Sequence, residues 1–322
     1  MRTQACAEQL KQEIGKIFIG KQRQVELIIM SVLAGGHVLL DDLPGSGKTT
    51  LVKAMTRALG CQFRRVQFTP DLLPSDIIGM TVFDQKTGAF RHIQGPVFTN
   101  ILLADEINRA IPRTQSALLE AMEEGQVTID NETFLLPEPF FVMATQNPVE
   151  RESTFELPAA QMDRFFVRLS LGFPSREEEA SMLEELGDAI DFSVVNAVSS
   201  PEELMELRRE IQGVHVSEYV RGYIVELVHR TREHSLLRSG ASPRASRCLF
   251  QGGKSYAAIQ GRDYVTPEDI AALFLPILGH RVLVTNEARY TKKTAEDILT
   301  AILEETPVPP GKGEMFHEAG RG

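Results

Sequence analysis

The chain has 322 residues, 43% hydrophobic and 24% charged, which suggests about two domains and excludes a wholly disordered chain, collagen or a coiled coil. Its 34 basic and 44 acidic residues give a net charge of −10, which disfavours a protein that coats nucleic acid or anionic membrane with its whole surface but leaves open a local basic patch. Cys6, Cys61 and Cys248 are too far apart in sequence for a CxxC zinc site and too few for a disulfide framework. Reduced thiols, and the absence of any apolar run of ~20 residues, favour a soluble, cytoplasmic protein.

The predicted elements begin with helical periodicity. Between residues 7 and 33, apolar residues recur at steps of three and four, with an interruption at 19–20. Five short apolar runs then alternate with helical stretches, at residues 38–40, 66–68, 101–104, 140–143 and 167–169. Because these runs are continuous rather than alternating, they indicate strands covered on both faces, as in the parallel sheet of an α/β fold.

Helix starts dominate after residue 174. Ser175, Ser200 and Thr266 are each followed by an acid at the third helical position, and two of them by proline at the first. We therefore predict an α/β domain over residues 1–173 and a smaller helical domain over 174–306. The tail over 307–322 has little to bury and is expected to be flexible.

A glycine-rich loop follows the first predicted strand, with the sequence Asp42-Leu43-Pro44-Gly45-Ser46-Gly47-Lys48-Thr49. A strand, such a loop and a following helix together cradle a triphosphate. The two glycines let backbone N–H groups point at the phosphates, and the helix N-terminus adds partial positive charge. Lys48 is expected to reach the β- and γ-phosphates, and the Thr49 hydroxyl to bind Mg²⁺. Asp42 replaces the usual first glycine, and its carboxylate is expected to turn away. The alternative, a glycine-rich turn without chemistry, is disfavoured by the flanking strand and helix.

A second acidic site follows about fifty residues later, where the apolar run at 101–104 ends in Asp105 and Glu106. Alone, such acids are common at the ends of buried strands. After a phosphate loop, they indicate that Asp105 holds Mg²⁺ and that Glu106 activates the attacking water as general base. The next strand ends near Asn147, whose amide can orient that water. The alternative for Asn147 is a simple Asn-Pro turn.

Two arginines are further candidates. Arg164 follows Asp163, so its alternative interpretation is an ordinary Asp–Arg surface pair. Arg244 follows Ser242-Pro243, which mark a helix start, and it therefore falls in the first helical turn. A cation there faces the positive end of the helix dipole, so a nearby anion such as ATP would explain its placement. The alternative is a solvated arginine.

Together these motifs resemble those of the AAA+ ATPases and, within them, the MoxR family. The resemblance covers roughly residues 10–305. It rests on the phosphate loop at 42–49, the acidic strand end at 103–110, the helix at 114–124, and the stretches 144–148 and 157–165. It implies a P-loop AAA+ core with a parallel five-stranded sheet between helices, plus a smaller all-α lid domain.

The resemblance also implies roles for individual residues. Asn147 would be sensor 1, Arg164 the finger that reaches the γ-phosphate of a neighbouring subunit, and Arg244 sensor 2. ATP would be bound by Ile19, Gly20, Gly45, Ser46, Gly47, Lys48, Thr49 and Thr50, with Mg²⁺ at Thr49 and Asp105. Family members form hexameric rings with the nucleotide between subunits. Inserts at about 79–95 and 126–137 have hairpin patterns, and in the family such hairpins are thought to engage substrate or partner proteins.

Three functions are compatible with this resemblance. The first is an ATP-hydrolysing chaperone that remodels, assembles or activates a protein complex, beside a protein with a von Willebrand A domain. The second is a nucleic-acid motor, but such motors use basic hairpin tips, and here the second tip is acidic at 130–132. The third is a switch that barely hydrolyses nucleotide, which Glu106 disfavours. We therefore expect a protein client, no nucleic acid and no membrane insertion.

Overall fold

The structure is a computed structural model. It describes residues 1–43, 45–147, 154–186 and 190–308. The chain forms two compact units, residues 1–211 and 212–322. Within the described ranges, every helix is too short or too polar to cross a membrane.

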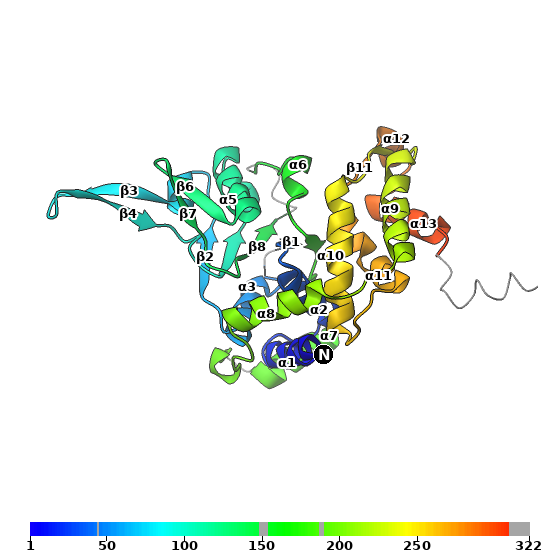
Figure 1. Cartoon of the computed structure of the whole chain (residues 1–322), viewed down its shortest axis with the longest axis horizontal. Helices are drawn as coiled ribbons and strands as arrows, with labels where there is room; N and C mark the ends of the chain where they lie inside the picture. The colour runs from blue at the N-terminus through cyan, green and yellow to red at the C-terminus, as the bar shows by residue number, and fades with distance from the viewer. Residues whose placement is uncertain (44, 148–153, 187–189, 309–322) are drawn as a thin grey trace, which may run out of the picture. The chain divides into compact units, whose positions relative to one another are not determined.

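A five-stranded parallel sheet organises the first unit (Figure 1). Its strands are β1 (Val38–Asp41), β2 (Phe63–Gln67), β5 (Ile101–Asp105), β8 (Phe141–Gln146) and β9 (Val167–Leu169), in the order β2-β5-β8-β1-β9. The five predicted strands and the α/β fold are therefore confirmed. The central strands β5 and β8 are buried throughout their apolar residues, as predicted. β2 is different, because it lies at the sheet edge and exposes Arg64, Arg65 and Gln67. The prediction that all five strands are covered on both faces is wrong for β2 and also for β9, the other edge strand, which exposes Arg168.

Helices pack around this sheet. They are α1 (Arg2–Gly15), α2 (Gln22–Ala34), α3 (Lys48–Ala58), α4 (Pro74–Ile78), α5 (Pro112–Glu124), α6 (Ala159–Met162), α7 (Arg176–Leu186) and α8 (Pro201–Gln212). One buried cluster joins side chains of β5 and β8 to the apolar face of α5. His37 strengthens that contact, because its Nδ1 accepts a hydrogen bond from the Val142 N–H at 3.0 Å. Its Nε2 then carries the proton and donates to the Met122 carbonyl, also at 3.0 Å. Burial lowers the pKa of His37 to about 4, so the ring is neutral at pH 7.

Two antiparallel hairpins occupy the stretches whose sequences predict them. The first consists of β3 (Gly79–Asp84) and β4 (Ala89–Gln94), and the second of β6 (Gln126–Ile129) and β7 (Glu132–Leu135). Asp130 and Asn131 both have positive φ, 47° and 70°, which is the backbone of a tight two-residue hairpin turn. The hairpins contact each other, since His92 Nε2 lies 3.0 Å from Glu132 Oε2.

The segment between α7 and the second unit packs on the first unit. Arg57 donates to the Val195 carbonyl at 2.8 Å, and Arg208 donates to the Val32 carbonyl at 2.8 Å. The Val198 N–H donates to the Ala58 carbonyl at 2.8 Å. These contacts place residues 190–211 in the first unit. The division between units thus falls after Ile211, later than the boundary after residue 173 that the sequence predicts.

The second unit is mainly helical. Its helices are α9 (Glu218–Glu233), α10 (Pro243–Ile259), α11 (Pro267–Leu278), α12 (Asn286–Tyr290) and α13 (Ala295–Glu305). The predicted cap at Thr266 is observed as a reciprocal capping box with Asp269. A small antiparallel pair, β10 (Leu237–Ser239) with β11 (Leu283–Val284), was not predicted. Most of the predicted tail lies outside the described residues.

Candidate nucleotide site

The glycine-rich loop has the backbone that phosphate binding requires. Gly45 and Gly47 have φ of 85° and 82°, a left-handed conformation that glycine adopts without strain. α3 begins at Lys48, so its free N–H groups open towards the loop. Lys48 Nζ donates to the carbonyls of Asp42 and Leu43 at 2.9 and 3.0 Å. Within the described part of the chain, the buried Ser46 hydroxyl has no hydrogen-bond partner. An unsatisfied donor in a cradle of N–H groups and a lysine fits a phosphate.

Asp42, the departure from the usual motif, is buried and fully engaged. Its carboxylate accepts hydrogen bonds from the Ser170 hydroxyl and from the N–H groups of Leu171 and Gly172, at 2.8, 2.8 and 2.9 Å. The side chain therefore points to the segment that follows β9, and its charge is balanced by donors of the protein itself. This arrangement explains why an acid is tolerated at the start of a phosphate loop.

A largely apolar hollow adjoins the loop. It is lined by Ile17, Phe18, Ile19, Lys21, Gly45, Ser46, Gly47, Thr50, Gly172, Pro174, Met182 and Ile190. The lining includes the predicted residues Ile19 and Thr50, and its apolar side chains suit a flat purine ring. Gly20 has φ of 78°, and a Cβ there would lie 2.0 Å from Glu178 Oε1. A side chain at this position would therefore strain the backbone and displace the Glu178 carboxylate.

The two acids lie side by side at the carboxyl end of β5. Thr145 of β8 joins them, since its hydroxyl donates to Asp105 Oδ1 at 2.6 Å and accepts the Glu106 N–H at 2.8 Å. Glu106 has φ of 56°, a left-handed backbone unusual for a residue with a side chain. Such strain is held in place by surrounding contacts and is concentrated at functional sites.

Partners from β2 and from the turn after β5 hold the carboxylates. Arg65 Nη2 lies 2.6 Å from Asp105 Oδ2 and 2.9 Å from Gln67 Oε1. Gln67 Nε2 in turn donates to Glu106 Oε2 at 2.8 Å, and Arg109 Nη1 donates to the same oxygen at 2.9 Å. The two acids are therefore linked twice, through Thr145 on one side and through the Arg65–Gln67 pair on the other.

Arg65, Gln67, Arg109 and Thr145 are site residues that the sequence reasoning missed. Arg109 and Thr145 lie within the motif stretches 103–110 and 144–148, whereas Arg65 and Gln67 belong to β2, where the sequence offered no signal for a site. The sheet register pairs Gln67 with Asp105, and strand pairing of that kind is fixed by the fold rather than by local sequence.

Asn147 follows directly after β8 and is buried. Its carbonyl accepts a hydrogen bond from Asn108 Nδ2 at 3.3 Å, which ties it to the turn that follows Glu106. Asn147 thus lies at the carboxyl ends of the parallel strands, the same end of the sheet that carries the two acids, where the sequence predicts it. Pro148, the other half of the alternative turn, lies outside the described residues.

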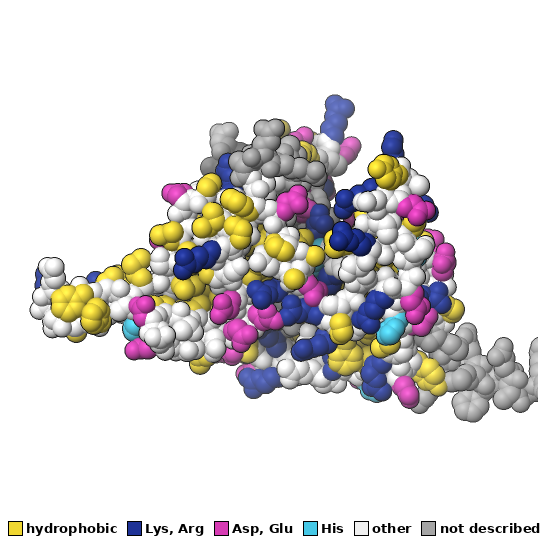
Figure 2. Space-filling view, turned by 90° about the horizontal axis from the view of Figure 1, so that it is seen from above, with side chains coloured by type: hydrophobic (Ala, Val, Ile, Leu, Met, Phe, Trp, Pro, Cys, Tyr) yellow, Lys and Arg dark blue, Asp and Glu magenta, His cyan; other side chains and the backbone are white. Residues whose placement is uncertain are grey.

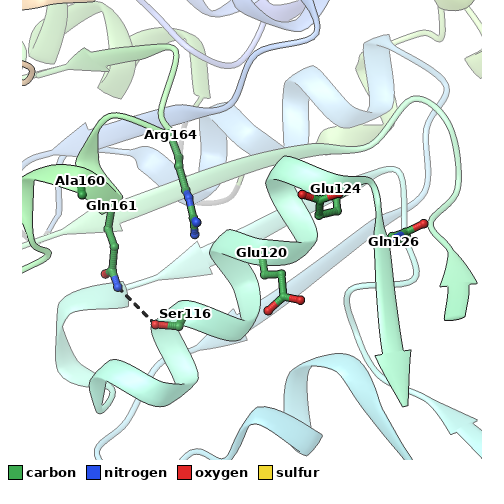
Figure 3. A pocket seen from close by; sticks show the side chains of 7 residues that line it. All are labelled: Ser116, Glu120, Glu124, Gln126, Ala160, Gln161 and Arg164. Carbon is green, nitrogen blue, oxygen red and sulfur yellow. Dashed lines mark hydrogen bonds between the residues drawn. The ribbon is translucent and has the colours of Figure 1, made fainter. Parts of the chain in front are cut away.

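Arg164 is placed beside α5 and not beside its sequence neighbour Asp163. Its Nε lies 2.9 Å from Glu123 Oε2. The side chain lines a pocket together with Ser116, Glu120, Glu124, Gln126, Ala160 and Gln161, as Figure 3 shows. The ordinary Asp163–Arg164 pair considered from the sequence is therefore not the contact that holds this arginine.

Arg244 occupies the first turn of α10, as the sequence predicts. Pro243 is the first helical residue, and the Ser242 hydroxyl accepts the Arg244 N–H at 3.2 Å. The residue belongs to the second unit, whereas all the other predicted site residues belong to the first.

These features define a class of protein. A phosphate loop, two acids at the end of a parallel strand and a following helical unit are those of a P-loop ATPase of the AAA+ type. The family model "ATPase family associated with various cellular activities (AAA)" matches residues 37–167, and the model "AAA lid domain" matches residues 229–302.

Relatives make the assignment narrower. The chain is 45% identical to YeaC of Bacillus subtilis (strain 168), over 92% of this chain and 93% of that protein. It is 39% identical to chaperone MoxR1 of Mycobacterium tuberculosis, over 92% and 81%. It is 33% identical to protein MoxR of Methylorubrum extorquens, over 94% and 95%. A solved structure from Cytophaga hutchinsonii matches with a TM-score of 0.90 and 38% identity, over 96% of each chain. The chain therefore belongs to the MoxR family of AAA+ ATPases, as its motifs predict.

Proposed function

We propose that this protein is an Mg²⁺-dependent ATPase that hydrolyses ATP to ADP and phosphate and uses the reaction to remodel or assemble a protein complex. The observation that supports hydrolysis most directly is Glu106. It has a strained backbone, lies beside Asp105, and is held by hydrogen bonds at the edge of the sheet that also ends in the phosphate loop. A protein that only bound nucleotide would not need a carboxylate maintained at that cost.

The residues divide the reaction between them. Lys48 and the N–H groups of the loop bind the β- and γ-phosphates, and the hollow beside Ile19 receives the adenine. Thr49 and Asp105 supply hard oxygen ligands suited to Mg²⁺, which when bound neutralises phosphate charge. Glu106 takes the proton of the attacking water, which Asn147 orients. Glu106 must first leave Gln67 and Arg109, which occupy the same carboxylate oxygen in this structure.

In this proposal, subunits assemble into a ring, and each nucleotide site is completed by a residue of the neighbouring subunit. We assign Arg164 as a finger that reaches the nucleotide of a neighbouring subunit, Arg244 as sensor 2, and a hexamer as the assembly. The location of Arg164 in the lining of an open pocket supports the first role. A neighbour's γ-phosphate would meet a planar fork of donors, which stabilises charge in phosphoryl transfer.

The client is proposed to be a protein, and the chaperone name of MoxR1 supports this class. A second observation is the surface of the β3–β4 hairpin, which Figure 2 shows as a projection with hydrophobic side chains. Phe83 and Phe90 are 54% and 74% exposed, and their rings lie 5.3 Å apart. Exposed aromatic pairs are typical of protein-binding surfaces. A von Willebrand A domain protein as partner and a cytoplasmic location remain part of the proposal, and the three free cysteines agree with a reducing compartment.

Mixing two inactive variants tests the proposal. Lys48→Ala removes the phosphate cation, and Arg164→Ala removes the finger; each alone is expected to lose nearly all turnover. In mixed rings some interfaces join an intact loop from the Arg164 variant to an intact finger from the Lys48 variant. ATPase activity should then return. Light scattering first establishes that mixed rings form.

The outcomes separate the parts of the proposal. If the wild-type protein shows no Mg²⁺-dependent release of phosphate from ATP, the ATPase assignment is wrong. If mixed rings form and no ratio of the two variants restores activity, the assignment of Arg164 to the neighbour's nucleotide should be dropped. Arg164→Lys is the control, because lysine keeps the charge but loses the planar fork.

A further inference from the structure

One face of α5 faces the loop that carries Arg164. Ser116, Glu120 and Glu123 follow each other at steps of four and three residues, so they lie along the same side of the helix. Two contacts join this side to the loop. Gln161 Nε2 donates to the Ser116 hydroxyl at 3.2 Å, and Arg164 Nε lies 2.9 Å from Glu123 Oε2. Figure 3 shows the Arg164 side chain directed towards α5, with Gln161 and Ser116 joined beside it.

The contact with Glu123 uses one particular part of the guanidinium. Arginine has five N–H groups in a plane, one on Nε and four on the two terminal nitrogens. The closest approach of the ion pair is at Nε, on the side of the guanidinium rather than at its terminal nitrogens. The two terminal nitrogens can bind two oxygens of a phosphate at once.

The pair is also sheltered enough to restrain the side chain. The Arg164 and Glu123 side chains are 29% and 35% exposed, so both are partly shielded from solvent. A long, flexible arginine loses much conformational freedom when it must adopt one geometry at the moment of reaction. A partner that restricts it beforehand reduces that loss, which is the principle of preorganisation in catalysis.

We infer that Glu123 is a positioning residue for the finger: it holds Arg164 by Nε so that the terminal nitrogens are presented to the neighbouring subunit's nucleotide. The inference rests on the trans role proposed for Arg164. It assigns a function to a residue at the end of α5, outside the phosphate loop and the two acids of the candidate nucleotide site. Glu120 and Glu124 line the same pocket and supply matched comparisons.

The first experiment compares Glu123→Ala with Glu120→Ala. Both changes remove one carboxylate from the same helix and the same pocket, but only the first removes the ion pair at Arg164 Nε. A partly exposed ion pair of this kind supports a loss of about fivefold. We expect kcat of Glu123→Ala to fall about fivefold while ATP affinity is unchanged, and Glu120→Ala to stay within about twofold of wild type. Glu123→Gln keeps an acceptor oxygen, so its kcat should lie between those of Glu123→Ala and wild type.

The second experiment asks whether Glu123→Ala impairs the face of the subunit that carries Arg164 or the face that carries the phosphate loop. Glu123→Ala keeps its phosphate loop, so adding Lys48→Ala subunits, which keep an intact finger, should raise turnover per Glu123→Ala subunit. Adding Arg164→Ala subunits should not, because both variants are defective on the same face. A merely structural defect would respond to neither partner, and recovery with Lys48→Ala also shows that Glu123→Ala is folded.

Failure of the inference and failure of the proposed function give different results. If Arg164→Ala keeps wild-type turnover, the finger assignment fails. If Arg164→Ala is inactive and complements Lys48→Ala, but kcat of Glu123→Ala equals that of Glu120→Ala, the positioning role of Glu123 is overturned. If Glu123→Ala does not fold, Glu123→Gln decides, since a kcat equal to wild type together with unchanged complementation would also overturn the role.

Discussion

The five-stranded sheet and the β3–β4 hairpin are both built from hydrogen-bonded strands, yet the sheet buries its apolar side chains and the hairpin exposes them. In the sheet, Leu103 and Met143 are completely buried, and the strand ends carry the acids and the loop of the nucleotide site. In the hairpin, Met80, Phe83, Phe90 and Ile93 are all exposed, although each is apolar. The hairpin extends from the rest of its unit, as Figure 1 shows.

This difference indicates which property each region supplies. The apolar residues of the sheet stabilise the fold and fix the positions of the strand ends, so the chemistry depends on them indirectly. The apolar residues of the hairpin stabilise little, since they remain in contact with water. A surface of that kind is better explained by contact with another molecule than by folding. The predictions below are ways to break or sharpen this distinction.

The largest expected effect is on the chemical step, at the carboxyl end of β5. Glu106→Gln keeps the shape and an acceptor oxygen but cannot take a proton from water. Loss of a general base lowers kcat by about 10²–10⁴. ATP binding should persist, and the ATP-bound assembly should accumulate. Phosphate release measures the rate, and Glu120→Gln, an exposed acid on α5, is the control. Wild-type turnover in Glu106→Gln would show that another group is the base.

The next effect concerns the stability of the sheet against acid. Burial lowers the pKa of folded His37 to about 4, whereas its ordinary value is 6.5. The unfolded chain therefore takes up the proton first as pH falls, so stability present above about pH 6.5 is lost between 6.5 and 4. The difference between the two pKa values corresponds to a loss of about 3 kcal/mol in the free energy of unfolding once the pH is below 4.

Urea unfolding from pH 8 to pH 4 measures this contribution. The wild type should lose stability more steeply below pH 6.5 than His37→Gln does. His229→Gln, at an exposed position of α9, is the control and should follow the wild type. Equal pH dependence in the wild type and His37→Gln would contradict the assignment of a neutral, buried ring.

A smaller effect is expected on binding. Lys48→Ala removes the cation aimed at the β- and γ-phosphates, and a charge-assisted contact of this type is worth about 1.5–3 kcal/mol. ATP affinity should therefore fall ~10-fold or more, with the fold unchanged. Calorimetry measures the affinity, and Lys53→Ala, an exposed lysine on the same helix, is the control. Unchanged affinity in folded Lys48→Ala would mean that this loop is not the site.

The smallest effect on the ATPase itself is expected at the hairpin. Phe90→Ala should change stability by less than about 0.5 kcal/mol and leave basal turnover within about twofold, because the side chain is exposed. The same substitution at Phe141, which is buried in β8, should cost about 3–5 kcal/mol. Thermal unfolding of both variants measures the contrast. A large loss of stability in Phe90→Ala would show that the hairpin surface serves the fold.

Much of the fold could be predicted from sequence because its signals are local. Apolar runs mark strands, Ser and Thr caps mark helix starts, and Asp130-Asn131 marks a turn. The exposure of β2 could not be predicted, because the order of the strands in the sheet decides which apolar runs are covered. The first compact unit extends to Ile211, beyond the predicted boundary, because residues 190–211 contact it through hydrogen bonds to backbone carbonyls that leave no sequence pattern.

The candidate site divides in the same way. The loop, Asp105 and Glu106 are contiguous motifs, and the sequence predicts them with their neighbours. Arg65, Gln67 and Arg109 act through hydrogen bonds to those acids, across strands that are distant in the chain. The pairing of Arg164 with Glu123 belongs to the same group. Contacts of this type depend on side-chain direction, which periodicity and composition do not record.

Asp42 has a consequence for anyone who would engineer this protein towards its consensus. Alignment to the usual phosphate loop would recommend Asp42→Gly, as a repair of an imperfect motif. In this chain that repair would delete three hydrogen bonds to residues 170–172 and leave the buried Leu171 N–H without that acceptor. Asp42 and the Ser170-Leu171-Gly172 segment therefore have to be redesigned together, because the acid accepts the hydrogen bonds that the segment donates.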